Sequence, residues 1–272
     1  CVRASCSGSE TMAHISLQNL SLSYPVLHGS ARSLKKTLFA RARASLGSTK
    51  SKVGGALQNG VSGLEVLALK DITFDVEGGE RLGLVGHNGA GKTTLLRVLG
   101  GIYETSSGSL SVEGETHAMI NPGSGMNQEL TGRENVHLFA RRLQLDVKET
   151  EALEADVEAF AELGPFFDLP LRLYSAGMSI RLGFALATVP RPQILLMDEW
   201  FMAGDSNFQA KARVRLESMV ETAEILVFTS HSLDILREWC TRVLWLEAGK
   251  IVMDGKPDAV LDAYEAFVAE SG

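Results

Sequence analysis

The sequence predicts an α/β fold: a core built on a parallel sheet, an antiparallel β-subdomain and an inserted α-helical subdomain. Apolar and polar residues alternate over residues 14–20 and again over residues 67–76, as in half-buried antiparallel strands. From Glu80 the pattern becomes strand, glycine-rich loop and helix, which is how a βαβ unit opens. Helical periodicity then continues until the later apolar strands, so we expect helices inserted into the α/β core.

The individual elements follow in chain order. A basic stretch at residues 30–43 precedes a Gly- and Ser-rich run at 44–63, which we interpret as a flexible loop; together they form an insertion at about residues 28–63. Core strands are expected at 81–86, 193–198 and 224–230, and helices at 134–143, 149–163, 175–188 and 257–270. We expect the helical subdomain to span about residues 124–188, within one domain at residues 12–272.

Composition narrows the class of protein. The 272 residues are 45% hydrophobic and 22% charged, which is enough to bury a substantial core. The net charge of −7 argues against binding nucleic acid through bulk electrostatics, because that needs clustered Lys and Arg. No apolar run approaches the roughly 20 residues of a membrane-spanning helix, so we expect another chain to cross any membrane that this protein serves.

The cysteines and the first residues bear on the compartment. Cys1, Cys6 and Cys240 form no disulfide framework, which suits a reducing compartment and predicts a cytoplasmic protein. Residues 1–11 are polar and lack the apolar stretch of a secretory signal. We expect a disordered leader or an added extension, with Met12 as the natural start; a functional Cys pair is the alternative.

A phosphate loop follows the strand at 81–86. Residues 86–93, GHNGAGKT, fit the pattern G-x-x-x-x-G-K-[ST] between a strand and a helix. Glycines let the backbone wrap around phosphates, Lys92 neutralises β/γ oxygens and the Thr93 hydroxyl ligates magnesium, whereas a plain glycine turn is the structural alternative. The predicted nucleotide-binding residues here are Gly86, Asn88, Gly89, Gly91, Lys92, Thr93 and Thr94.

Two adjacent acids end the apolar strand ILLMDE. Alone, such acids are usually a solvated turn, but together with a phosphate loop they indicate a Walker B strand. We expect Asp198 to hold magnesium and Glu199 to orient and polarise the attacking water.

Three further motifs occur in a fixed order and resemble those of ABC ATPases. YSAGM at 174–178 resembles the ABC signature, which is more commonly LSGGQ; SHS at 230–232 follows a strand, and Gly204 with Asp205 follows Walker B. The resemblance covers residues 67–255 and implies that Ser175 and Gly177 bind the γ-phosphate of ATP held by a partner copy. It also implies that His231 contacts the γ-phosphate and that Asp205 belongs to a loop crossing to the partner's site.

Two positions are assigned only by this resemblance. Asn121 directly follows the strand HAMI and takes the place of the lid glutamine that senses the γ-phosphate and magnesium in the family; Gln128 is the alternative. The Asn121 side chain is one methylene shorter, so it reaches less far. Tyr24 takes the place of the aromatic residue that stacks on adenine, although a buried Tyr at a strand end is the structural alternative.

The segment GMNQELTGREN, with YSAGM and MDEWFMAGD, looks like the ATPase subunits that export O-antigen, capsule and teichoic acid. That resemblance implies a polytopic membrane permease docked against residues 126–134. The basic segment at 30–43 resembles the extra N-terminal helix that these exporters place near the membrane, where an anionic membrane face or a lipid-linked glycan would meet it; a solvated surface helix is the alternative.

The function expected from these resemblances is ATP hydrolysis, with Mg²⁺, in a peripheral subunit at the cytoplasmic face of the inner membrane. Two copies would close head to tail on two ATP molecules and drive export of a lipid-linked polysaccharide through a separate permease. One alternative is an exporter of a drug, lipid or peptide. The other is an ABC protein acting on ribosomes or DNA, which is disfavoured because those have two cassettes or long coiled coils.

Overall fold

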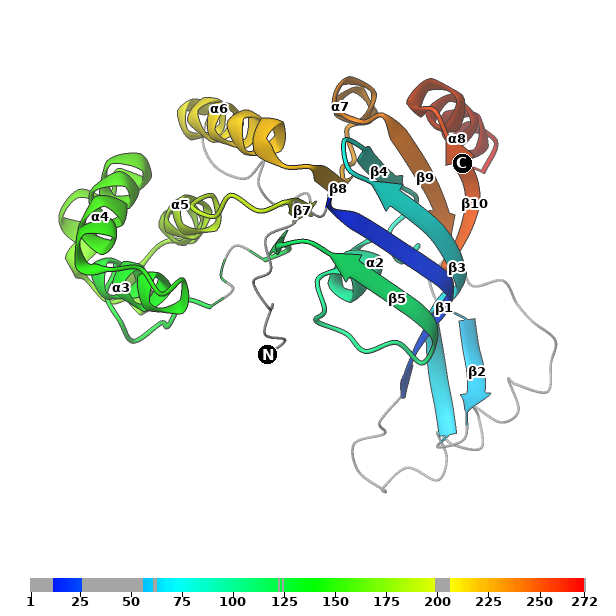
Figure 1. Cartoon of the computed structure of the whole chain (residues 1–272), viewed down its shortest axis with the longest axis horizontal. Helices are drawn as coiled ribbons and strands as arrows, with labels where there is room; N and C mark the ends of the chain where they lie inside the picture. The colour runs from blue at the N-terminus through cyan, green and yellow to red at the C-terminus, as the bar shows by residue number, and fades with distance from the viewer. Residues whose placement is uncertain are drawn as a thin grey trace.

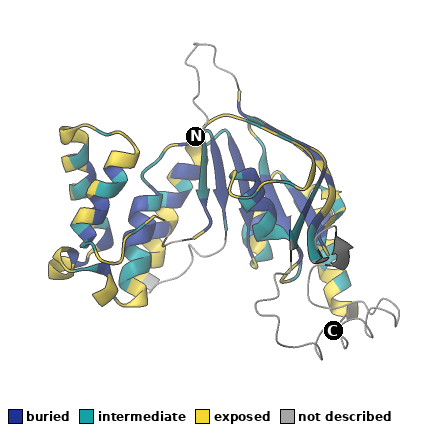
Figure 2. Ribbon diagram, turned by 90° about the horizontal axis from the view of Figure 1, so that it is seen from below, coloured by how far each residue is buried: buried dark blue, intermediate teal, exposed yellow. Residues whose placement is uncertain are grey.

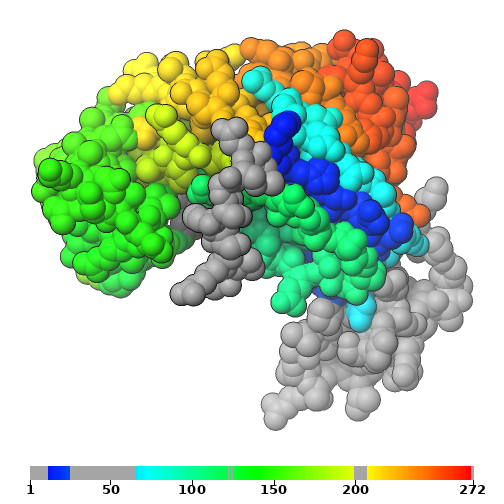
Figure 3. Space-filling view, in the orientation of Figure 1, coloured from blue at the N-terminus to red at the C-terminus, as the bar shows by residue number. Residues whose placement is uncertain are grey.

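The computed structural model describes residues 12–25, 56–60, 63–121, 123, 125–198 and 206–271. An antiparallel sheet and a mostly parallel sheet face each other, and the helical subdomain projects to one side of both (Figures 1 and 3). The expected basic helix at 30–43 and the leader at 1–11 lie outside the described residues.

The antiparallel sheet has the strand order β2-β3-β1-β5. Its members are β1 (His14–Pro25), β2 (Ala56–Gly60), β3 (Gly63–Glu77) and β5 (Ser107–Glu113). The predicted pairing of the first two alternating stretches is confirmed, because β1 runs antiparallel to β3 with Ile15 opposite Val76 and Leu17 opposite Phe74.

The prediction of a flexible loop over residues 44–63 is wrong for residues 56–60. Ala56–Gly60 form β2, which pairs antiparallel with the first part of β3, from Ala56 opposite Leu67 to Gly60 opposite Gly63. The pairing is set by the free edge of a 15-residue strand, whose backbone N–H and C=O groups need partners. The composition of ALQNG carries no apolar alternation that would reveal it.

The second sheet has the order β10-β9-β4-β8-β7-β6 and is parallel except for β10. Its strands are β4 (Arg81–Val85), β6 (Thr116–Met119), β7 (Ile194–Met197), β8 (Ile225–Thr229), β9 (Arg242–Glu247) and β10 (Lys250–Gly255). All residues of β7 and β8 are buried, as expected of a parallel sheet covered on both faces. The three predicted core strands are therefore confirmed.

Helices cover both faces of the parallel sheet. Helix α2 (Lys92–Leu99) packs between the two sheets, where its Leu95, Leu96 and Val98 join an apolar core with residues of both. Helices α6 (Ser206–Thr222), α7 (Leu233–Trp239) and α8 (Pro257–Ser271) contribute to the core on the opposite face. Helix α8 confirms the predicted closing helix, and none of the helices in the described ranges has the length and apolarity needed to span a bilayer.

The helical subdomain contains α3 (Gly132–Arg142), α4 (Val147–Ala161), the 3₁₀ turns η1 (Gly164–Asp168) and η2 (Leu171–Leu173), and α5 (Ala176–Ala187). These confirm the three predicted helices, and reciprocal capping boxes at Thr131 and Asp146 start the first two. The subdomain has its own apolar core, visible as the inward-facing dark blue of Figure 2.

An aromatic cluster joins this subdomain to the core. The Phe184 ring of α5 stacks on Phe160 of α4 at 5.6 Å between ring centroids and meets Phe208 of α6 edge-on at the same distance. Nearby, the His117 Nε2 atom of β6 lies 2.8 Å from the carbonyl oxygen of Ala187, which can only accept, so the ring donates from Nε2. Burial lowers the pKa of His117, which keeps that ring neutral near pH 7.

We expect Phe184→Ala to destabilise the protein by about 3–5 kcal/mol, because it removes a fully buried ring from the cluster that joins the two subdomains. Thermal unfolding followed by circular dichroism measures this. Val214→Ala, at a residue of α6 that is 68% exposed, is the control and should leave the melting temperature nearly unchanged. Equal shifts in the two variants would contradict the assigned role of the cluster.

Candidate phosphate-binding site

A pocket of about 370 Å³ lies at the carboxyl ends of the parallel strands, beside the antiparallel sheet. This is the edge at which open α/β sheets bind ligands. Three residues that were not predicted, Val66, Ala68 and Thr229, line it together with nine predicted site residues: Tyr24, Asn88, Gly89, Gly91, Lys92, Thr93, Thr94, Asp198 and His231.

The loop after β4 needs glycine for steric reasons. Gly86 has φ +149° and Gly91 has φ +112°, a region that L side chains rarely adopt. A Cβ at Gly86 would overlap the carbonyl oxygen of Leu246 on β9. At Gly91 it would come 3.0 Å from Leu69 Cδ2 and 3.1 Å from the carbonyl oxygen of Ala68. A plain glycine turn does not account for the close approach of β9 and β3 to this loop.

The start of α2 is arranged for an anion. Gly91 caps the helix without a side chain, so no side-chain oxygen accepts from the first N–H groups. Lys92 Nζ donates to the carbonyl oxygens of Gly86 at 2.5 Å and His87 at 3.2 Å, which holds the ammonium group across the loop. A helix start without a side-chain cap and a fixed cation together form a site for phosphate oxygens.

The structure places the Asp198 carboxylate beside the Thr93 hydroxyl. Thr93 Oγ1 donates to Asp198 Oδ2 at 2.7 Å, and Thr229 Oγ1 donates to Asp198 Oδ1 at 2.5 Å. Hydroxyl and carboxylate oxygens are ligands that Mg²⁺ accepts beside phosphate oxygens. The donor set of Thr93 and Asp198 therefore fits a magnesium ion, and Thr229 orients the carboxylate.

The structure places Tyr24 beside the pocket, near the end of β1. It lines the pocket, and its ring also packs edge-on against Tyr103, with 5.5 Å between centroids and 76° between planes. Burial raises the pKa of Tyr24, while a hydrogen bond with the Thr94 side chain acts against that rise. The ring is thus held in place at the pocket wall.

Several predicted residues are not brought to this pocket. The Asn121 side-chain oxygen accepts from the backbone N–H of Gly123 at 3.0 Å, and Gln128 is exposed. Ser175 caps α5 by accepting from Met178 N at 3.2 Å, away from the pocket with Gly177 in the helical subdomain. Glu199 and Asp205 lie outside the described residues.

Comparisons with known proteins agree with this geometry. The family model described as ABC transporter matches residues 69–202. The O-antigen export system ATP-binding protein RfbE of Yersinia enterocolitica is 40% identical over 88% of this chain and 97% of its own length. The chain belongs to the ABC transporter family.

Other relatives of this ABC chain bear similar names. The teichoic acids export ATP-binding protein TagH of Lactococcus lactis is 34% identical over 86% of this chain and 49% of its own length. A solved ATP-binding subunit of an ABC transporter superposes with a TM-score of 0.65 at 21% identity, covering 92% of this chain and 93% of that one. A dimeric ATP-binding cassette in a post-hydrolysis state with ADP and Pi gives 0.63 at 18% identity, covering 89% and 98%. The two structures show that the fold is shared.

Sequence reasoning missed three pocket residues of the ABC chain. Val66 and Ala68 belong to β3, and no local pattern marks a strand residue that faces a loop more than 15 residues away. Thr229 had a usable signal, because a hydroxyl ends the apolar strand ILVFT just before His231. Parallel strands end at the same edge of a sheet, so the Thr229 hydroxyl could be expected to lie near Asp198.

We expect Gly86→Ala to weaken ATP binding by at least about tenfold, because the added Cβ would overlap Leu246 and displace the loop. Titration with a fluorescent ATP analogue measures this. Gly101→Ala is the matched control: Gly101 also has positive φ, +66°, but a Cβ there would have no neighbour within 4 Å. Equal affinities of the two variants would show that backbone strain alone, and not the overlap, matters.

Proposed function

We propose that this ABC chain hydrolyses ATP to drive export of a lipid-linked polysaccharide through a separate transmembrane subunit. The observation that supports ATP hydrolysis most directly is the Thr93–Asp198 pair beneath a loop spanned by Lys92. Polysaccharide as cargo is supported by the 40% identity to an O-antigen export ATP-binding protein over nearly the full length of both chains.

Each residue of the pocket has a distinct task in this proposal. Lys92 and the N–H groups of the loop bind the β- and γ-phosphates and stabilise the charge that develops between them. Thr93 and Asp198 hold a magnesium ion, which when bound neutralises phosphate oxygens. Glu199, proposed from the sequence, orients the attacking water, and His231 contacts the γ-phosphate from the end of β8. Tyr24 offers its ring to the adenine base.

The proposal includes a second copy of the chain, and Gly177 supports it. Among the described residues, a Cβ at Gly177 would meet nothing nearer than Ser175 Oγ at 3.9 Å, so packing within that part of the chain gives no reason for glycine there. Glycine inside a helix costs about 0.5–1 kcal/mol relative to alanine. In the proposed dimer, a phosphate of ATP on the partner chain approaches Ser175 and the first turn of α5. A side chain at Gly177 would obstruct that approach, which explains the glycine. Asp205 is proposed to cross toward the same partner site.

The remaining assignments concern the lid and the membrane. Asn121 or Gln128 is proposed to approach the γ-phosphate and magnesium when the two chains close. A polytopic permease is proposed to dock against residues 126–134 at the cytoplasmic face of the inner membrane. The basic segment at 30–43 is proposed to meet anionic lipid or the lipid-linked glycan.

We expect Gly177→Ala to raise the stability of the isolated chain by up to about 1 kcal/mol and to weaken ATP-driven association of two chains. The added methyl group has space in one chain but would crowd the partner's phosphate. Chemical unfolding and sedimentation with ATP measure the two effects. A variant that is both more stable and associates as well as the parent protein would contradict the proposed partner site.

We expect Glu199→Gln to keep ATP binding but to slow turnover at least about a hundredfold, roughly 3 kcal/mol of barrier. With ATP and Mg²⁺ it should therefore stay in the closed state, which allows a mild-detergent pull-down from native membranes. Mass spectrometry should then find a polytopic membrane protein with lipid-linked glycan.

The other outcomes of this pull-down are informative. A membrane partner without glycan would keep the ATPase and replace the cargo by a drug, lipid or peptide. Ribosomes or nucleic acid in its place would overturn the transport function. Near-normal turnover of the variant would contradict the role of Glu199.

A further inference from the structure

The sequence TGREN at 131–135 marks a resemblance to polysaccharide exporters, and the structure gives each of its residues a task. Thr131 and Glu134 form the capping box of α3, with hydrogen bonds of 3.1 and 2.8 Å. Asn135 is 2% exposed. Its side chain accepts from Asn127 N at 2.7 Å and donates to the carbonyl oxygens of Asn127 and Thr131 at 3.1 and 2.8 Å. The first turn of α3 thus fixes segment 127–131.

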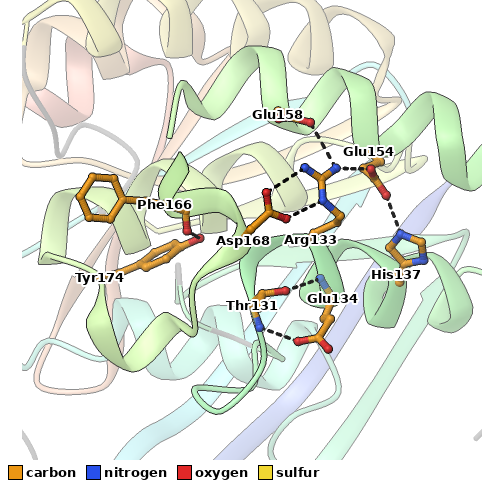
Figure 4. Close-up of polar contacts among 9 residues, drawn as sticks. All are labelled: Thr131, Arg133, Glu134, His137, Glu154, Glu158, Phe166, Asp168 and Tyr174. Atoms are coloured by element: carbon orange, nitrogen blue, oxygen red, sulfur yellow. Dashed lines mark hydrogen bonds and ion pairs between the residues drawn. The ribbon is translucent and has the colours of Figure 1, made fainter. Parts of the chain in front are cut away.

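Arg133 fixes a second segment to the same turn. Its guanidinium group lies 4.8 Å from the centroid of the Phe167 ring and donates to Asp168 Oδ1 at 2.8 Å. It also pairs with Glu154 and Glu158 of α4 (Figure 4). These contacts join η1 to both α3 and α4. The acidic partners raise the pKa of Arg133 further above its already high value, so the group stays charged.

Gly132 lets Tyr174 come close to α3. A Cβ at Gly132 would lie 2.5 Å from Tyr174 Oη and 2.8 Å from Phe167 Cδ2. The Tyr174 hydroxyl donates to the carbonyl oxygen of Phe166 at 2.9 Å, which closes a loop over η1 and η2 (Figure 4). Tyr174 directly precedes Ser175, so this contact lies one residue from the signature serine.

Backbone hydrogen bonds hold the two segments together along their length. Leu171 N donates to Leu130 O and Arg172 N donates to Gln128 O, both at 3.0 Å. Thr131 and Pro170 form an antiparallel bridge between these bonds and Gly132. Any displacement of segment 127–131 is therefore shared by segment 170–174, because no free space separates them at Gly132.

We propose that Gly132, Arg133 and Tyr174 are positioning residues that hold Ser175 where the partner chain's ATP needs it. They tie Ser175 to segment 127–131, which overlaps the proposed docking surface of the permease. The inference rests on the proposed head-to-tail dimer. It assigns to TGREN a role in the partner's ATP site and none in the ATP site of its own chain.

The test distinguishes effects in the chain that contributes Lys92 to an ATP site from effects in the chain that contributes Ser175 to it. Full-length chains, all carrying Glu199→Gln, are labelled with a donor or an acceptor dye, and energy transfer reports association with ATP. Lys92→Ala and Ser175→Ala chains should each fail to associate alone. Their mixture should associate, because it contains one complete site made of Lys92 from one chain and Ser175 from the other.

Gly132→Ala or Tyr174→Phe is then added to one chain of the mixture. In the Lys92→Ala chain, which supplies Ser175, Gly132→Ala should raise the ATP concentration at half-association about tenfold or more. There, Tyr174→Phe should raise it about threefold, as expected for one lost hydrogen bond. In the Ser175→Ala chain, the same substitutions should have no effect.

The control is Tyr264→Phe, at another half-buried tyrosine, in α8, whose ring packs on Trp245 of β9; this substitution should be neutral in either chain. Equal effects in both chains, or no effect in either, would overturn the inference, since a general loss of stability does not depend on which site is tested. If the mixture of Lys92→Ala and Ser175→Ala chains fails to associate, the head-to-tail dimer itself is wrong. Tyr174→Phe keeps the test decisive if Gly132→Ala does not fold.

Discussion

The two hydrogen bonds to the Asp198 carboxylate hold the nucleotide site together. One oxygen accepts from Thr93 on the helix after β4, and the other accepts from Thr229 at the end of β8. In the sheet, β8 lies between β4 and β7. The carboxylate therefore links Thr93 and Thr229, which are 105 and 31 residues from it along the chain. These donors offset part of the cost of placing a carboxylate at the end of a fully buried strand.

The helical subdomain depends on this frame for its placement. Helix α5 is held at its carboxyl end by His117, from the strand beside β7, and along its length by the aromatic cluster of Phe160, Phe184 and Phe208. At its amino end, Tyr174 packs against Gly132. The signature serine thus projects from a helix that is fixed at both ends, which suits its proposed role of meeting a phosphate group on a partner chain without rearranging.

The sequence predicts best those features that are specified by residues close together along the chain. The phosphate loop, the buried strand before Asp198 and the capped helices are each specified within about ten residues, and all are found as expected. Strand β2 was not predicted, because its pairing depends on the free edge of β3 and not on its own composition. Val66 and Ala68 join the pocket only through sheet order, which no local pattern encodes.

Asn121 shows a different limit of sequence reasoning. It follows β6 as expected, yet its side chain bonds to the backbone two residues on, at Gly123. Short amides compete in this way for nearby N–H groups, which a longer glutamine does less readily. Position along the chain located the residue, but side-chain chemistry decides what it contacts.

The pocket wall also has a consequence for how the protein is made. Tyr24 comes from the first strand and His231 from the end of β8, so the wall unites residues from nearly the whole chain. During synthesis, the first strand must wait for its distant partners, and such long-range closure is slow. A nascent chain can therefore complete this pocket wall only after residue 231 has left the ribosome. From then on, ATP binding stabilises the completed fold by mass action, so the nucleotide also favours the last step of folding.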